Sequence, residues 1–462
     1  MKYISSSIIF KIIITCIFCV FVFTWKSSTA IAFSFFLFVL LSSILISVIS
    51  SNNSEKSCLY SLFFTITPFY LIYCLVAHLG YLGNSNFYFY PDQGYFYSVS
   101  NNLGELNSFK EIIEACFINR VHFESEGAHF LFGSIAFIAN KYFDGNSVLL
   151  QSLYVSFFAI LSNLFVFKLL KKFLLKSTAK RYTLTFALLT PILFFSPWLL
   201  RDVHITFLFS VAIYLTFRKI NLKNSILFFA VFTITSQFRM EHSLIILLFF
   251  IIHLYYNRQY SSFVKKYWSV FIFFGVGIIT IILFTQSKNL FKAVETLDRY
   301  ELHTVSELND SGLGSKLYDL PFGIKHLAIA VNSQLTPLPP WALINFHQNI
   351  FVILTATTLG VVTIYWSYIF LFLLYSFTTE GIIRKLPKSL FLFLILVVAF
   401  LLLNSTNVVV RRIMVIYPVI FLIYAFVKEY KLNEYKKSII HRRSVISYIF
   451  LLVIYILFKV FL

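Results

Sequence analysis

The sequence predicts an all-α, polytopic membrane protein built as a single helical bundle. Of its 462 residues, 59% are hydrophobic and only 12% are charged, and the mean hydropathy is +0.82. An average soluble domain carries about 25% charged residues, so this chain lacks the polar surface that soluble domains need. The net charge of +19 would suggest nucleic acid in a soluble protein. Here the net charge has another cause, which is the concentration of Lys and Arg in short connections between apolar runs. We therefore expect no nucleic-acid partner.

About eleven apolar runs are long enough to cross a lipid bilayer, which takes roughly 20 helical residues. These runs lie at 8–25, 29–49, 58–82, 146–170, 182–200, 203–217, 267–285, 349–377, 388–406, 413–427 and 445–461. A shorter apolar run at 128–143 is predicted to be an interfacial or re-entrant helix on the outer side.

Basic residues set the orientation, because cytoplasmic connections are enriched in Lys and Arg. Most of these residues fall in short connections at 168–181, 218–223, 258–266, 384–388 and 428–443. Two large loops, 84–127 and 286–346, hold twelve of the nineteen carboxylates. We therefore place the basic connections in the cytoplasm and the two large loops outside.

The apolar run at 225–256 is interrupted by a polar insert that contains Arg239, Glu241 and His242. Basic residues lie on both of its outer flanks, which favours a re-entrant hairpin of two half-helices that enters from the cytoplasm. The insert would then form the tip of the hairpin, at membrane depth. The alternative is one long tilted helix, which would reverse the orientation of every later span.

Charged residues inside or beside the hydrocarbon region are costly unless paired or hydrated, so each is a candidate functional residue. Arg201 and Asp202 stand between two spans at the predicted outer face, where they either satisfy each other in a turn or bind substrate. Arg239 either forms an internal ion pair that locks two helices or binds an anion. Glu241 or His242 beside it would then move a proton.

Two further arginines, Arg411 and Arg412, open a late span at its predicted outer end. They are either anchors for lipid headgroups or part of an anion site, because guanidinium groups present planar forks of donors that suit phosphate oxygens. Together with Arg201 and Arg239 they could converge from separate helices on one anionic group. A lipid-linked pyrophosphate is the candidate for that group.

The two outer loops add candidate substrate-binding residues. Asp92 and Tyr95 belong to the segment YFYPDQGYFY, whose rings either stack on sugars or form the aromatic belt of the membrane interface. Glu126 opens the short apolar run that follows the first loop. Trp341 and His347 follow a proline-rich segment where the chain re-enters the membrane, which suggests the lid or wall of a site.

The order of these features resembles that of the Wzy-type polymerases of O-antigen and capsule and of the related EpsG-like polymerases. The resemblance covers roughly residues 85–425. It includes the aromatic segment around Asp92, Glu126 and Gly127 where relatives often have Glu-Pro, then SPWLLRD, FRMEH, the Pro-Trp re-entry and the Arg-rich start of a late span with Tyr417 and Pro418. One departure is that the ligase-like pattern of arginine motifs in two loops, found in some relatives, is not evident.

The resemblance implies a metal-independent glycosyltransferase without a cofactor, located in the bacterial inner membrane with its active site facing the periplasm. The enzyme would transfer a growing glycan from undecaprenyl pyrophosphate to the non-reducing end of another lipid-linked repeat unit. The arginines would bind the pyrophosphate, and Glu241, His242 or Asp92 would deprotonate the acceptor hydroxyl. The lipid bilayer surrounds it, and a flippase and a chain-length regulator of the same pathway are candidate protein partners.

Two other functions fit parts of the sequence. A GT-C-like glycosyltransferase that uses a polyprenyl-phosphate sugar also places a carboxylate in its first large outer loop, as Asp92 would be, but the usual paired acidic motif is missing. A lipid-linked oligosaccharide flippase would have short loops and pseudo-symmetric halves. In this chain the two outer loops are long and the halves do not look alike.

Overall fold

The computed structural model describes residues 28–81, 92–119, 125–218, 221–257, 323–403 and 410–461, together with positions 266, 269, 277, 317, 320 and 321. These residues form helices joined by turns, and no strand occurs among them, which confirms the all-α prediction. They divide into two compact units. Unit 1 takes in the described residues up to Val211, Val231–Ser243 and Pro340–Tyr365, and unit 2 the remainder.

Unit 1 is organised around three long apolar helices, α2 (Thr29–Ile49), α3 (Asn53–Gly80) and α7 (Val148–Phe173). Each begins at a side-chain cap: the oxygen of Ser28, Asn52 or Ser147 accepts a backbone N–H of the first turn, which satisfies a donor that the helix leaves open. The helix α3 has 28 residues, or about 42 Å, which exceeds the roughly 30 Å of a hydrocarbon core.

Aromatic rings and small polar side chains hold these helices together. Phe38 of α2 stacks on Phe157 of α7, with ring centroids 3.9 Å apart and an interplanar angle of 3°. The buried Asn163 of α7 donates to the Tyr70 hydroxyl of α3 at 3.1 Å. Close packing and such interhelical hydrogen bonds are what hold helices together where the surrounding solvent is itself apolar.

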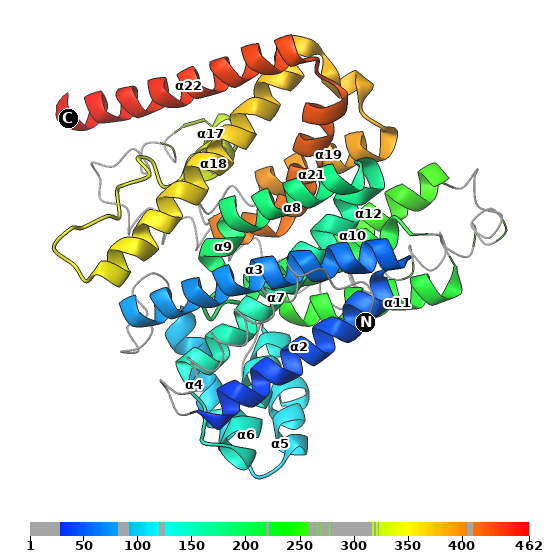
Figure 1. Ribbon diagram of the computed structural model, residues 1–462, viewed down its shortest axis with the longest axis vertical. Coiled ribbons are helices and arrows are strands. Elements are labelled where there is room, and N and C mark those ends of the chain that lie inside the picture. Colours follow the sequence, from blue (N-terminus) through cyan, green and yellow to red (C-terminus); the bar gives the residue numbers. More distant parts are fainter. Residues whose placement is uncertain are drawn as a thin grey trace. The chain divides into compact units, whose positions relative to one another are not determined.

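The span predicted at 182–200 is broken in the structure. The chain forms α8 (Lys176–Leu189), then α9 (Pro191–Phe195), then a turn before α10 (Arg201–Thr216). Thr190 is extended between α8 and α9, because a residue before proline avoids the helical region and proline lacks a backbone N–H. In Figure 1, α8 runs beside α7 and α3.

The predicted outer loop 84–127 is helical over most of its described residues. It contains α4 (Asp92–Gly104), α5 (Phe109–Ile113) and a π-helix (Glu114–Ile118). The apolar run at 128–143 forms α6 (Glu126–Tyr142), which packs closely on α4. A Cβ at Gly104 would lie 2.8 Å from the Cβ of Ala136, so this contact needs glycine. The position of α6 relative to a membrane stays a prediction.

The run at 225–256 forms two helices that fold back on each other, α11 (Leu222–Phe238) and α12 (Met240–Asn257). Phe228 of α11 stacks on Phe250 of α12 with ring centroids 4.0 Å apart. Residues 22 positions apart would lie about 33 Å apart along one helix, so this contact excludes the single long helix. Entry of the hairpin from one membrane face stays a prediction.

In unit 2 a buried aromatic pair joins elements distant in sequence. Trp366 stacks on Tyr417 with centroids 3.6 Å apart, and its indole N–H donates to Gln334 at 3.0 Å.

The helices beyond α12 are α17 (Ile324–Leu335), α18 (Ile350–Glu380), η3 (Ile382–Lys385), α19 (Lys388–Leu403), α20 (Val410–Ile413), η4 (Met414–Ile416), α21 (Tyr417–Tyr430) and α22 (Glu434–Phe461). Most of the basic connection predicted at 428–443 is therefore helical. Lys and Arg are good helix formers, and Asn433 caps α22 by accepting the Lys436 N–H.

Six helical segments in the described part of the chain are long and apolar enough to cross a membrane: α2, α3, α7, most of α18, Arg411–Tyr430 and most of α22. The expectation of a helical protein with several candidate spans is thereby supported. The count of about eleven stays a prediction. The run at 8–25, all of 267–285 except positions 269 and 277, and most of the predicted loop 286–346 lie outside the described residues.

Candidate active site

A chain of three charged side chains links α10 to the tip of the hairpin in unit 1. The Arg239 guanidinium donates to Asp202 at 3.2 Å, and its Nε lies 3.2 Å from a Glu241 carboxylate oxygen. Only 7% of the Arg239 side chain and 4% of the Asp202 side chain are exposed, whereas 60% of the Glu241 side chain is exposed. The buried ion pair of Asp202 and Arg239 therefore holds the exposed Glu241 carboxylate through the Arg239 guanidinium.

Burial separates the two proton-transfer candidates next to Arg239. His242 is 1% exposed, and its Nδ1 lies 3.9 Å from the Glu241 carboxylate. Glu241 itself faces outward, so its carboxylate can meet a substrate while His242 lies behind it. The sequence left two alternatives for Arg239, an internal ion pair or an anion site. In the structure Arg239 forms an internal ion pair between two helices.

Arg201 stands at the start of α10 and joins two other elements. Its Nη1 donates to the Ser125 hydroxyl, and to the Phe238 carbonyl at 3.4 Å. Both acceptors are neutral oxygens, and together they fix the position of the guanidinium. Arg201 is half-buried, and its positive charge is close enough to Glu241 to favour the ionised form of that carboxyl. Arg201 and Asp202 each have a partner on another element, which is Ser125 for Arg201 and Arg239 for Asp202.

Ser125 was not singled out by sequence reasoning. It occupies the cap position before α6, yet its side chain caps no backbone N–H there, and its hydroxyl accepts from Arg201 instead. A serine directly before an apolar helix is a recognisable capping signal, which predicts its position but not its partner.

The start of α6 lies directly against the hairpin tip. A Cβ at Gly127 would lie 2.9 Å from the Phe238 ring and 3.1 Å from the Gln237 carbonyl carbon, so only glycine allows this approach. Glu126 is half-buried on the side of the π-helix. Burial and the negative charge of Glu126 together raise the pKa of the Cys116 thiol to about 11.

The aromatic segment enters the site through α4. Asp92 is exposed at the start of this helix. Its neighbour Gln93 is fully buried and accepts the Leu199 N–H at 3.3 Å, two residues before Arg201. Tyr95 is 51% exposed and contacts the buried His129 of α6 edge-on, with ring centroids 5.5 Å apart. Gln93 and His129 therefore tie the predicted residues to the site.

A second buried histidine lies beneath the cluster. His204 of α10 is 1% exposed and packs among the rings of Phe132, Phe158 and Phe238, at centroid distances of 5.5, 4.7 and 5.8 Å. Its position two residues after Asp202, among apolar residues, indicates a core role that holds α6, α7, α10 and the hairpin tip together.

Trp341 and His347 are exposed in unit 1, on turns that precede α18. A Cβ at Gly80 would lie 3.0 Å from the Phe351 backbone, so the start of α18 packs on the end of α3. In the part of the chain that the structure describes, neither Trp341 nor His347 contacts the charged cluster. Arg120, His122 and Glu124, which precede α6 in the first outer loop, lie outside the described residues.

Arg411 and Arg412 are half-buried in α20, in unit 2. They precede η4 and α21 as the sequence predicted, with Pro418 in the first turn of α21. Because Arg201 and Arg239 belong to unit 1, the convergence of all four arginines on one anion stays a prediction.

The charged cluster lies at the end of α3 opposite a second, basic cluster. Tyr81 follows α3 and contacts Trp198 with ring centroids 5.9 Å apart, three residues before Arg201. At the other end of α3, the fully buried Glu55 contacts Lys168 and Lys171 of α7. We call these the site end and the basic end of unit 1.

No protein-family model, curated protein or solved structure matches this chain. Within the described part of the chain, no group of three or more His, Cys, Asp or Glu side chains is arranged to hold a metal ion.

Proposed function

We propose that this protein is a bacterial inner-membrane glycosyltransferase that polymerises lipid-linked oligosaccharide repeat units at the periplasmic face. The observation that carries the proposal is the exposed Glu241 carboxylate, held by the buried Asp202–Arg239 pair beside Arg201. An accessible carboxylate next to a fixed guanidinium suits a reaction in which a hydroxyl loses a proton while a phosphate leaves.

The position of the site supports an outer location. Lysines gather at the basic end of unit 1, and such residues favour the cytoplasmic side. The site end is the opposite end of the same long helix α3. A substrate anchored in the outer leaflet by a polyprenyl chain would present its pyrophosphate and first sugar at this level.

In the proposed reaction, an acceptor hydroxyl attacks the anomeric carbon of the donor glycan. The carbon–oxygen bond to undecaprenyl pyrophosphate breaks, and the leaving phosphate oxygen takes the electron pair. Glu241 accepts the hydroxyl proton, and the Arg201 guanidinium stabilises the charge that develops on the leaving group. Arg239 is a positioning residue that orients Glu241, because its own side chain is buried against Asp202.

The remaining predicted residues take supporting roles in this proposal. Tyr95 offers an exposed ring for stacking on a sugar, and Asp92 an exposed carboxylate at the same helix start. Trp341 and His347 are exposed near the end of α3 and would contact the glycan.

The test is a gel of lipid-linked glycan from the native host after deletion of the gene and complementation with variants. We expect deletion to leave a single repeat unit on its lipid. Wild type should restore the ladder, whereas Glu241→Gln and Arg201→Ala should lower polymerisation about 100-fold, as loss of a proton-transfer group or charge-stabilising donor does. Glu434→Gln, which removes a carboxylate from a side chain 90% exposed on α22, is the matched control.

Two outcomes would overturn the proposal. If deletion also removes the single repeat unit, the protein acts earlier, as a flippase or as a GT-C-like enzyme that builds the unit. If the ladder is restored fully by Glu241→Gln and Arg201→Ala at wild-type protein levels, the charged cluster is not the active site.

A further inference from the structure

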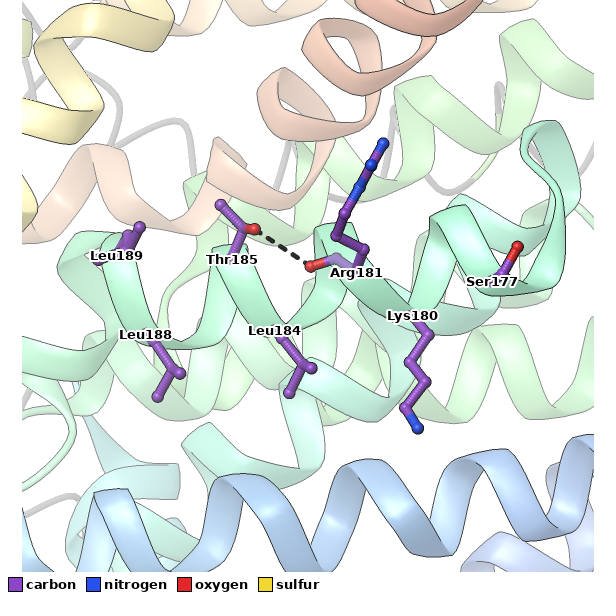
Figure 2. Close-up of a pocket in the computed structure, with 7 residues that line it drawn as sticks. All are labelled: Ser177, Lys180, Arg181, Leu184, Thr185, Leu188 and Leu189. Carbon is purple, nitrogen blue, oxygen red and sulfur yellow. Dashed lines mark hydrogen bonds between the residues drawn. The ribbon is translucent and has the colours of Figure 1, made fainter.

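The surface of α8 carries a shallow hollow of about 500 Å³ that lies away from the charged cluster. It is lined by Ser177, Lys180, Arg181, Leu184, Thr185, Leu188 and Leu189. In Figure 2, Lys180, Leu184 and Leu188 follow one edge of the hollow, and Arg181 lies at its opposite edge. Residues four apart share a helix face, so two adjacent rows each begin with a cation and end with a leucine.

The length of these rows matches one leaflet of a membrane. Ser177 and Leu189 are 12 positions apart, which corresponds to about 18 Å along the helix. Half of a hydrocarbon core is about 15 Å. The cations lie together at the first turns of α8, and the leucines extend away from them along α7 and α3. This arrangement complements an amphiphile with an anionic head and an apolar chain.

The charges next to the hollow are unbalanced. Glu55 contacts both Lys168 and Lys171, so one carboxylate faces two ammonium groups. Lys176 and Lys180 donate to the hydroxyls of Ser54 and Ser61 on α3, and these neutral partners leave the positive charge in place. Among the described residues, positive charges therefore outnumber negative ones at the point where the hollow begins.

We propose that this hollow binds an anionic phospholipid of the leaflet at the basic end. Lys180 and Arg181 would hold the headgroup phosphate, and Leu184, Leu188 and Leu189 would contact an acyl chain. Each basic residue near a membrane surface increases the affinity for anionic lipid, and the effects of two such residues multiply. The inference is independent of the proposed glycosyl transfer, because it concerns the other end of α3.

The experiment is native mass spectrometry of the full-length protein in detergent, titrated with phosphatidylglycerol or phosphatidylcholine of the same acyl chains. We expect tighter binding of phosphatidylglycerol, and the double variant Lys180→Ala/Arg181→Ala should weaken it about 30-fold. The matched control is Arg442→Ala/Arg443→Ala, which removes two neighbouring exposed cations from α22 and should leave the affinity within about twofold of wild type.

Three results would overturn the proposal: equal affinity for the two lipids, an equal loss in the Arg442→Ala/Arg443→Ala control, or displacement of the lipid by millimolar inorganic phosphate. Arg181→Glu, at an exposed position, provides a second variant if the double variant does not fold. It should lower phosphatidylglycerol binding and leave phosphatidylcholine binding unchanged.

Discussion

The two ends of unit 1 each hold a small network of charges, and the networks differ in what they expose. At the basic end, the Glu55 carboxylate is fully buried between Lys168 and Lys171. At the site end, the buried pair of Asp202 and Arg239 holds Glu241, of which 60% of the side chain is exposed. The first network can only stabilise helix packing, whereas the second presents a charged group to a ligand. A structural ion network buries its carboxylate, as at Glu55, whereas a candidate active site leaves a carboxylate exposed, as at Glu241.

The largest effect on stability is expected at the basic end. Glu55→Gln would leave Lys168, whose side chain is 9% exposed, without its carboxylate, and we expect a loss of about 3–5 kcal/mol. Glu241→Gln at the site end should cost less than about 1 kcal/mol, because exposed ion pairs contribute little. Thermal unfolding of both variants in one detergent checks this, and equal losses would contradict the distinction between the two networks.

The next effect concerns the buried pair at the site end. A double-mutant cycle of Asp202→Asn and Arg239→Gln should give a coupling energy of about 1–3 kcal/mol, because the two side chains are buried and in direct contact. The readout is again the unfolding free energy. A coupling energy near zero would show that the pair does not hold α10 to the hairpin tip.

A third effect tests the close approach of α6 to the hairpin. Gly127→Ala would press a methyl group against the Phe238 ring and the Gln237 backbone, and overpacking of this kind costs about 1–3 kcal/mol. Adding Phe238→Leu should recover part of the loss. An unchanged unfolding midpoint for Gly127→Ala would mean that the two segments are not in contact.

The smallest effect is expected at Asp144, which accepts hydrogen bonds from the Ala30 N–H and the Thr29 hydroxyl at the start of α2. Partial burial raises the pKa of Asp144, but these bonds and one from Ser28 outweigh it, so its pKa lies below the usual 3.8. The associated stability is present above that value and is lost as the pH falls through the lowered pKa.

Asp144→Asn should therefore remove an acid-dependent loss of less than about 1 kcal/mol. The measurement is the unfolding midpoint of wild type and variant between pH 7 and pH 3. A larger acid dependence in the variant than in wild type would reverse the expected sign.

Several features could be predicted because they depend on local sequence. The limits of α2 match the predicted run 29–49, since a continuous apolar segment with a serine cap determines its own helix. The polar insert around Arg239 marked the break between α11 and α12, because charges are excluded from an apolar helix. The prediction failed at Thr190, where a proline interrupts an otherwise apolar run and splits one span into α8 and α9.

The sequence by itself determined that the chain is a helical protein with long apolar segments, and which charged residues lie among them. Only the tertiary structure decided how those charges are used, because pairing depends on contacts between residues distant in the chain. In the fold, Arg239 is buried against Asp202 and Glu241 is exposed. Arg201 donates to Ser125, which lies 76 positions away in the sequence. The sequence alone does not distinguish Arg201 from Arg239, whereas in the fold Arg201 is a candidate anion ligand and the buried Arg239 positions Glu241.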